Sequence, residues 1–539
     1  MKDSRIVEYL MPERIKSVGG SVADVQTLLQ QKTPQIGLNE TELAEIDGAG
    51  YFILDFGREL SGGIRILTYR AEGNTSVRIR FGESLSETCS QPKGAAADAT
   101  ATNDHSLRDF EVKLVTLSDM RFGNTGFRFV RLDFPAGCKI KLKNIFAAFE
   151  HRELKRTGYF ECSDPLVNRI FETAAYTVEL CMQSMLWDGI KRDRLVWIGD
   201  MHPEMLAIVS LFNADPCIEQ ALLFAREEAP LPGFMNNIPS YSFWWLIIIA
   251  DYYLHNGNIA FLKEERDYIT ALVRQIDALT DQDGGMELSR YFLDWPTADS
   301  EGRAGTYALC AYAMKKTRII YRALGEHDAV LDGILNRIDR TLKGGNFKQV
   351  AAMRVFAEFD KAEDVVLRQI QGGAQGMSAF MSYYILSSVA MAGRTRDALQ
   401  MLREYYGGML SRGATTFWED FDISWLDGSG RIDEFPDADQ KDIHGDFGAY
   451  CYRGFRHSLC HGWSSGPVPF LMHYVLGVRE IEAGCTKIVF APELCGLKWA
   501  KGSYPTPYGK IEISMKEIDG EMKAEIKAPA EVEIISLND

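Results

Sequence analysis

The sequence lacks the features that mark several special classes of protein. The longest apolar run, residues 243–250, is far short of the roughly 18 residues needed to span a bilayer. The ten Cys residues form no C-x-x-C pair, which argues against a disulfide framework or a structural zinc site. Met1 and Lys2 lead into acidic residues with no apolar segment, so no secretory signal is expected. We therefore expect a cytoplasmic protein with reduced thiols and no membrane partner.

Other motifs and charges are also missing. The sequence contains no H-E-x-x-H zinc motif, no G-x-G-x-x-G turn and no Walker loop, so it predicts no metal and no cofactor. Its 59 basic residues are outnumbered by 75 acidic ones, giving a net charge of −16, which argues against nucleic acid as a partner. With 46% hydrophobic and 25% charged residues, the 539-residue chain has the composition of a globular protein of several domains.

The periodicity of apolar residues changes at two places along the chain. Residues 1–155 show short alternating runs at 51–57, 63–69, 76–81 and 127–132, separated by turn signals such as Gly73-Asn74 and Gly123-Asn124, which predict an N-terminal β-sandwich. The small polar segment 91–105 is expected to be a surface loop. Residues 483–539 again show the alternating pattern that is typical of β-strands, which predicts a small C-terminal β domain. Asp519-Gly520 predicts a hairpin turn within it.

Residues 156–482 have helical periodicity. Ser163-Asp164-Pro165 is a helix start, and apolar residues then recur every four positions from Leu166. Similar patterns predict helices at 243–254, 261–279, 306–324, 377–391 and 398–406, with Gly407-Gly408 ending the last. The outline suggests either three independent domains or, more economically, a sandwich docked on a helical barrel.

The most unusual stretch is residues 187–200. It concentrates three carboxylates (Asp188, Asp193 and Asp200), three cations and two Trp residues in what reads as a loop after a helix. Reactive groups gather on such loops, although a solvated charge cluster with Trp side chains in the core is an equally ordinary interpretation.

Three further segments carry candidate polar groups. Glu419 follows Trp418, an aromatic neighbour that would raise a carboxyl pKa or frame a sugar ring, although a Glu beside a Trp more often lies at the rim of a pocket without a catalytic role. His461 lies in a stretch of small residues that lacks a G-x-S-x-G motif, so a serine hydrolase triad is rejected, and a lone His is usually a core donor. Asp294-Trp295 suits hydrogen bonding to a hydroxyl beside a stacked ring, or a helix cap with a buried Trp.

Together these segments resemble glycoside hydrolase family 78, the inverting α-L-rhamnosidases with a central (α/α)6 barrel. The family's acidic loop, R-D-E-R-L-x-W-x-G-D with a preceding Asp, is matched by Asp188, Arg192, Asp193, Trp197 and Asp200, and its T-T-x-W-E motif by residues 415–419. The resemblance extends to both β regions. It implies that Asp193 is the general acid and Glu419 the general base, two carboxyl groups that stand about 6.5–9.5 Å apart in inverting enzymes.

The resemblance also implies a set of sugar-binding side chains. These are Asp188, Arg192, Trp197, Asp200, Trp245, Asp294, Trp295, Trp418 and His461. The family usually has Glu where this chain has Asp193, and the neighbours of His461 are changed, which puts the substrate in question. The expected function is release of terminal α-L-rhamnose from small glycosides. The alternatives are an exo-glycosidase for another sugar and a carbohydrate-binding homologue with little activity. A homo-oligomer is possible.

Overall fold

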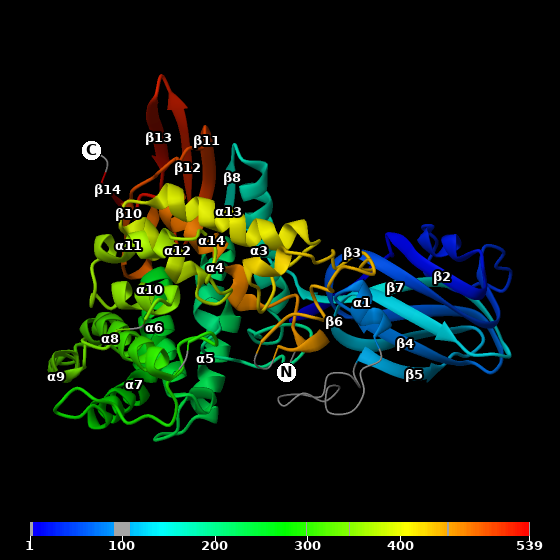
Figure 1. Ribbon diagram of the computed structural model, residues 1–539, viewed down its shortest axis with the longest axis horizontal. Coiled ribbons are helices and arrows are strands. Elements are labelled where there is room, and N and C mark those ends of the chain that lie inside the picture. The colour runs from blue at the N-terminus through cyan, green and yellow to red at the C-terminus, as the bar shows by residue number, and fades with distance from the viewer. Residues whose placement is uncertain (1–3, 91–107, 298, 344, 450–451, 538–539) are drawn as a thin grey trace.

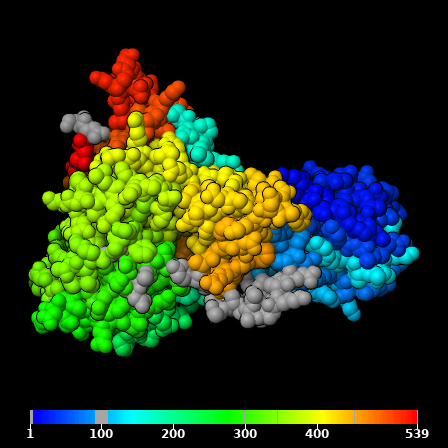
Figure 2. All heavy atoms as spheres, in the orientation of Figure 1, coloured from blue at the N-terminus to red at the C-terminus, as the bar shows by residue number. Residues whose placement is uncertain are grey.

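The computed structural model describes residues 4–90, 108–297, 299–343, 345–449 and 452–537. A β-rich N-terminal region, a helical body and a small C-terminal β region follow one another along the chain (Figure 1), which confirms the predicted multidomain architecture. The molecule is elongated, and the C-terminal strands project from the helical body (Figure 2). The loop predicted at 91–105 lies outside the described residues. None of the helices in the described ranges is both long and apolar enough to cross a membrane.

The N-terminal region is one sheet folded over on itself. Its strands are β1 (Arg5–Leu10), β2 (Arg14–Ala23), β3 (Ala44–Gly73), β4 (Ser76–Gly82), β5 (Asp109–Lys113), β6 (Ser118–Phe134) and β7 (Cys138–Arg152). Residues 139–142 of β7 pair with 44–47 on one side and with 68–72 on the other, so the sheet must curl. The curl packs two layers around buried side chains such as Phe52, Ile66 and Phe127.

The prediction of separate strands at 51–57 and 63–69 was wrong, because both belong to β3. Gly57 and Gly62 have φ values of 79° and 132°, and the pairing with β6 shifts register at both places. Glycine therefore forms bulges that bend the strand and do not end it. The predicted turn at Gly123-Asn124 likewise lies inside β6.

The helical body is a double ring. The inner helices are α4 (Met201–Phe212), α6 (Pro239–Asn256), α8 (Asp299–Leu324), α10 (Lys348–Phe356), α12 (Ser382–Met391) and α14 (Pro467–Phe470). Each inner helix contacts the next, and α14 contacts α4, which closes the ring. The alternating helices are α3 (Pro165–Cys181), α5 (Pro216–Glu228), α7 (Ile259–Leu279), α9 (Ala329–Arg337), α11 (Ala362–Ile370) and α13 (Thr395–Ser411). This alternation is the (α/α)6 barrel that was predicted.

Local chemistry explains several helix limits. Asp164 caps α3 by accepting a hydrogen bond from the Leu166 amide at 2.9 Å, as the sequence predicts. Gly407-Gly408 does not end α13, which continues to Ser411. A Cβ on Gly408 would lie 3.1 Å from the Phe421 ring, so this glycine permits close packing, and the stop comes at Gly413, which has a φ of 89°.

Two small sheets close the far end of the barrel. One contains β8 (Tyr159–Cys162), β11 (Trp499–Thr506), β12 (Gly509–Ile518) and β13 (Glu521–Lys527), and the other β9 (Val478–Glu482), β10 (Lys487–Phe490) and β14 (Glu533–Ser536). The predicted hairpin at Asp519-Gly520 joins β12 to β13. Because β8 precedes the barrel and pairs with β11, the C-terminal sheet is tied to both ends of the helical body. The domain limits at 155 and 482 stay predictions.

Candidate active site

A cavity of about 220 Å³ lies beside the first turns of α4 and α6. Its walls bring together eight of the residues singled out in the sequence: Asp188, Arg192, Asp193, Trp197, Asp200, Trp295, Glu419 and His461. Trp463 also lines it. The acidic loop, the Trp-Glu segment and the His461 segment therefore share one chamber, although they are far apart in the chain.

Backbone hydrogen bonds hold these three segments together. The Gly462 amide donates to the Asp188 carbonyl at 2.7 Å, and the His461 amide donates to the Phe417 carbonyl at 3.1 Å. The Glu419 amide donates to the Ser458 carbonyl at 3.0 Å. Peptide groups thus position the reactive side chains, which limits their freedom before any ligand arrives.

Glu419 is the best-anchored carboxylate in the cavity. Nη2 of Arg192 lies 2.5 Å from both of its oxygens, and the Ser458 amide donates to Oε2 at 3.0 Å. Burial alone would raise the pKa of Glu419, but Arg192 and then His461 outweigh burial and hold this pKa below its usual value. Glu419 is therefore ionised at neutral pH and able to accept a proton as a base.

His461 bridges two carboxylates. Its Nε2 lies 3.0 Å from Oδ1 of Asp200, and its Nδ1 lies 3.8 Å from Oε1 of Glu419. Burial would lower the pKa of this imidazole, but Glu419 and Asp200 together raise it to about 9. His461 is therefore a buried cation at neutral pH, and it offsets part of the negative charge of the cavity.

Two other acidic side chains of the cavity, Asp188 and Asp200, have raised pKa values. Burial, followed by the charges of Asp193 and Asp200, raises the pKa of Asp188 well above its usual value, and burial also raises that of Asp200. Asp188 accepts a hydrogen bond from the Leu195 amide at 2.9 Å. A neutral carboxyl group can donate as well as accept a hydrogen bond, which suits contact with sugar hydroxyls.

Glu204 lies behind this acidic group and was not singled out in the sequence. It is one turn along α4 from Asp200, is fully buried, and its Oε1 has no hydrogen-bond partner among the described residues. Burial raises the pKa of Glu204 well above its usual value. A Cβ on Gly462 would lie only 1.7 Å from this oxygen, so a glycine is required there.

Asp193 has an unusual backbone. Asp193 and Arg194 have φ values of 52° and 56°, two consecutive non-glycine residues in the left-handed region. Aspartate enters this region more readily than longer side chains do, so the local fold accounts physically for Asp where the family usually has Glu. The Asp193 carboxylate lies 3.2 Å from Nη1 of Arg192 and 3.7 Å from Nη2 of Arg456.

Three residues predicted to bind substrate do not line the cavity. The Trp245 indole is fully buried and donates to the Leu222 carbonyl, because its position on α6 faces away from the chamber. The buried Trp418 ring packs edge-on against Phe421 and His457. Asp294 accepts hydrogen bonds from Ser378 and from the Trp295 amide, so it supports the turn that presents Trp295. Burial raises the pKa of Asp294 to about 6.

Several cavity residues escaped the sequence analysis, namely Ile238, Tyr241, Arg290, Phe292, Tyr452 and Arg456. Phe292 precedes Asp294 by two positions, which was the available signal. The others come from segments without a local motif, and only the closure of the barrel brings them to the cavity.

The N-terminal sandwich supports the acidic loop from behind. Nζ of the fully buried Lys191 lies 2.8 Å from Glu87 and 3.3 Å from Glu83, and Thr125 donates to the Lys191 carbonyl at 3.1 Å. Glu83, Glu87 and His444 come close enough to share a metal ion, but this ammonium group already supplies a cation there. A second such group is His255, Glu480 and Cys485, in which the His255 nitrogens already face Glu480 and Asn213.

Comparisons with known proteins agree with this geometry. Residues 155–325 match the bacterial alpha-L-rhamnosidase 6 hairpin glycosidase domain, and residues 477–536 match the bacterial alpha-L-rhamnosidase C-terminal domain. An alpha-L-rhamnosidase of Alteromonas sp. (strain LOR) is 22% identical over 86% of this chain and 53% of its own length. The chain thus spans about half the length of that curated relative.

Solved structures share the fold. The family 78 rhamnosidase of Bacillus sp. GL1 superposes with a TM-score of 0.74 and 22% identity, over 95% of this chain and 55% of its own. The Streptomyces avermitilis α-L-rhamnosidase, whose structure is complexed with L-rhamnose, has a TM-score of 0.70 and 17% identity, over 90% and 48% of the two chains. These findings confirm the resemblance: residues 155–325 and 477–536 match two domains of the bacterial α-L-rhamnosidases, and the chain shares its fold with solved rhamnosidases of glycoside hydrolase family 78.

Proposed function

We propose that this protein hydrolyses terminal α-L-rhamnosides with inversion, using Asp193 as general acid and Glu419 as general base. The observation that carries the proposal is that both carboxyl groups contact one guanidinium, since Nη1 of Arg192 faces Asp193 and Nη2 faces Glu419. A guanidinium between two carboxyl groups keeps them apart, which supports an inverting arrangement, in which water must fit between base and sugar.

In the proposed reaction Glu419 accepts a proton from a water molecule as that water attacks the anomeric carbon. The glycosidic C–O bond breaks, and Asp193 donates its proton to the departing oxygen. Positive charge develops on the sugar ring in the transition state, and the ionised Glu419 stabilises it. Asp188, Asp200 and His461 would form hydrogen bonds with the hydroxyl groups of the sugar ring. Trp295 and Trp463 would pack against the sugar.

Exo action on small glycosides and a cytoplasmic location are part of the proposal. A half-enclosed chamber of about 220 Å³ suits one terminal sugar better than the middle of a polymer. The nine described Cys residues are all free thiols, which fits a reducing compartment.

The test is hydrolysis of 4-nitrophenyl α-L-rhamnoside by the wild type, Asp193→Asn and Glu419→Gln, with the exposed Glu434→Gln as matched control. Loss of a general acid or base lowers kcat by about 10²–10⁴-fold, and the control should keep full activity. Proton NMR of the first product should show the β-anomer. Full hydrolysis by both variants, or the α-anomer appearing first, would contradict the proposal. A panel of other aryl glycosides separates this activity from that of an exo-glycosidase for another sugar.

A further inference from the structure

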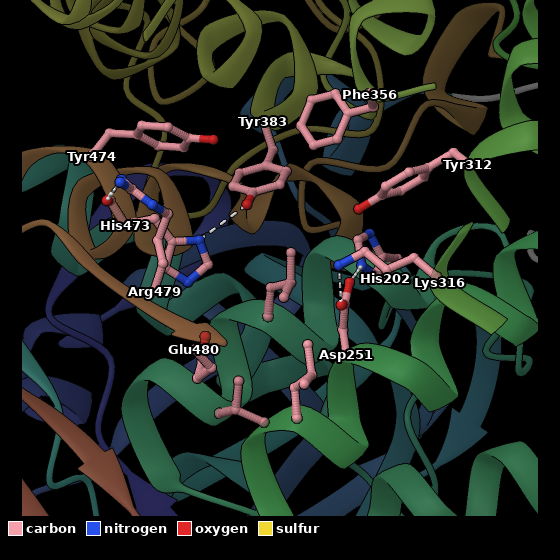
Figure 3. Close-up of a pocket in the computed structure, with 13 residues that line it drawn as sticks. His202, Asp251, Tyr312, Lys316, Phe356, Tyr383, His473, Tyr474, Arg479 and Glu480 are labelled. Carbon is pink, nitrogen blue, oxygen red and sulfur yellow. Dashed lines mark hydrogen bonds and ion pairs between the residues drawn. The ribbon is translucent and has the colours of Figure 1, made fainter. Parts of the chain in front are cut away.

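A second cavity, of about 180 Å³, lies inside the barrel near the C-terminal ends of α4 and α6 (Figure 3). Its walls come from α4, α6, α8, α10, α12 and the segment 473–480, and none of its lining residues belongs to the catalytic cavity. Figure 3 shows His473, Tyr474 and Arg479 on one side and Tyr312, Lys316 and Asp251 on the other. The cavity is comparable in size to the catalytic one.

A layer of aromatic rings separates the two cavities. Trp463, which lines the catalytic cavity, stacks on Phe380 with centroids 5.1 Å apart, and Phe380 packs edge-on against Trp244 at 5.9 Å. Trp244 in turn stacks on His202, which lines the second cavity, at 5.5 Å. A ligand in one chamber therefore does not enter the other.

Both carboxylates of the second cavity already have partners in the protein. Asp251 is paired with Lys316 and lies 2.9 Å from Nε2 of His202. Burial would raise the pKa of Asp251, but Lys316 and His202 outweigh burial and lower it to about 2. Oε1 of Glu480 lies 3.0 Å from Nδ1 of His255 and accepts a hydrogen bond from Tyr504.

Arg479 and His473 retain unused bonding capacity. Nη1 of Arg479 donates to the His473 carbonyl at 2.8 Å, and the guanidinium carbon lies 5.4 Å from the centroid of the Tyr474 ring, but within the described ranges no carboxylate forms an ion pair with this guanidinium. His473 is buried, its Nδ1 lies 3.0 Å from the Tyr383 hydroxyl, and its Nε2 has no partner among the described residues. Burial lowers the pKa of His473 to about 4, so the ring is neutral at pH 7. A buried polar nitrogen without a partner is costly unless a ligand or water satisfies it.

We propose that this cavity binds a polyhydroxylated anion the size of one monosaccharide, a sugar acid or a sugar monophosphate, with its anionic group on Arg479 and a hydroxyl on Nε2 of His473. A guanidinium pairs with carboxylate or phosphate through two parallel hydrogen bonds, which an unpaired Arg479 can supply. The rings of Tyr312, Phe356 and Tyr474 offer apolar faces, and tyrosine hydroxyls offer further hydrogen bonds, a combination that matches the two kinds of surface on a sugar.

Isothermal titration calorimetry on the full chain tests this site with three probes of similar size: D-gluconate, D-glucose 6-phosphate and neutral D-sorbitol. At least one anion should bind, and sorbitol should bind about tenfold more weakly or worse. Gluconate alone would identify a carboxylate ligand and the phosphate alone a phosphorylated one. Absence of binding by both anions would overturn the proposal.

Variants locate the binding. Arg479→Gln should weaken binding of the anion by about tenfold or more, while the exposed Arg274→Gln should leave it unchanged. Should Arg479→Gln fold poorly, His473→Gln provides the second test, with a loss of severalfold. Glu419→Gln should retain full anion affinity, and Arg479→Gln should retain rhamnoside hydrolysis. Anion binding that survives Arg479→Gln and His473→Gln, or that disappears in Glu419→Gln, would refute the second site.

Discussion

The Nη2 atom of Arg192 lies 2.5 Å from both carboxylate oxygens of Glu419, a residue 227 positions away in the chain. Both side chains are almost fully buried, so little solvent screens the attraction between them. The same guanidinium reaches Asp193 through its other terminal nitrogen. Arg192 therefore keeps Glu419 ionised and contacts both carboxyl groups of the proposed catalytic pair.

Replacing Arg192 by Gln should move the acidic limb of the pH–rate profile to higher pH. Arg192 is the main group that lowers the pKa of Glu419 against the effect of burial, so its loss raises that pKa. The base must be ionised, and activity will then be lost at a less acidic pH. The measurement is kcat/KM from acidic to neutral pH. Arg290→Gln, at an exposed arginine of the same cavity, serves as control and should leave this limb in place.

His461 should stabilise the fold in a pH-dependent way. Its pKa is raised to about 9 in the folded protein and is about 6.5 when unfolded, so its contribution is fully present below pH 6.5 and is lost as the pH rises through 9. The difference in unfolding free energy between wild type and His461→Gln should shrink over this range by an amount on the order of 3 kcal/mol. Denaturant titrations at each pH measure it.

His457→Gln is the matched control for that experiment. His457 is equally buried beside the same cavity, but burial holds its pKa well below the usual value, so it stays neutral from pH 6.5 upward. The difference between wild type and His457→Gln should therefore be constant over this range. A constant difference for His461→Gln as well would show that His461 is not a buried cation.

The left-handed backbone at Asp193 predicts opposite outcomes for two substitutions. Asn tolerates this region as Asp does, so Asp193→Asn should add no backbone strain while losing activity, and any loss of stability in it comes from the missing contacts with Arg192 and Arg456. Asp193→Glu restores the residue usual in the family but should lower the unfolding free energy by about 1 kcal/mol. Thermal unfolding of the three proteins decides the point, and an Asp193→Glu variant as stable as the wild type would contradict the account.

Two tryptophans on the predicted list should behave differently. Trp295→Phe alters a cavity wall and should raise KM severalfold, with little effect on stability. Trp245→Phe loses the hydrogen bond to the Leu222 carbonyl and leaves a gap in the core, so it should lower the unfolding free energy by about 1–3 kcal/mol with KM unchanged. Steady-state kinetics and denaturant unfolding of both variants separate the roles. A raised KM in Trp245→Phe would place that ring at the substrate.

Lys191→Met should destabilise the junction between sandwich and barrel. It removes the ammonium group between Glu83 and Glu87 and leaves buried carboxylates less compensated, a change that typically costs about 3–5 kcal/mol. Adding Glu83→Gln should recover part of this loss, because one buried charge is then gone. Lys155→Met, at an exposed lysine, is the control. Equal unfolding free energies for Lys191→Met and the control would refute the role.

Sequence reasoning succeeded where the chemistry is local. The Asp164 cap and the Asp519-Gly520 hairpin lie where predicted, because a cap or a two-residue turn depends on a few neighbouring residues. The predicted ends of a strand at Gly57 and of a helix at Gly408 were wrong. In the sequence, a glycine that bends a strand or makes room for a neighbouring ring cannot be distinguished from one that ends an element. That Trp245 lies outside the cavity was not predictable, because a fully buried helix has no polar face to reveal which side meets the cavity.

The amino-acid sequence by itself determined the order of β and helical regions and the four segments that carry the candidate polar and aromatic side chains. Periodicity and spacing along the chain are enough for this, because they reflect which faces must be buried. Only the tertiary structure decided that Arg192 joins Asp193 to Glu419, that His461 is charged and that Arg479 lines a second chamber. Pairing, burial and charge depend on which remote segments the barrel brings within a few ångströms of one another, and that information is absent from local patterns.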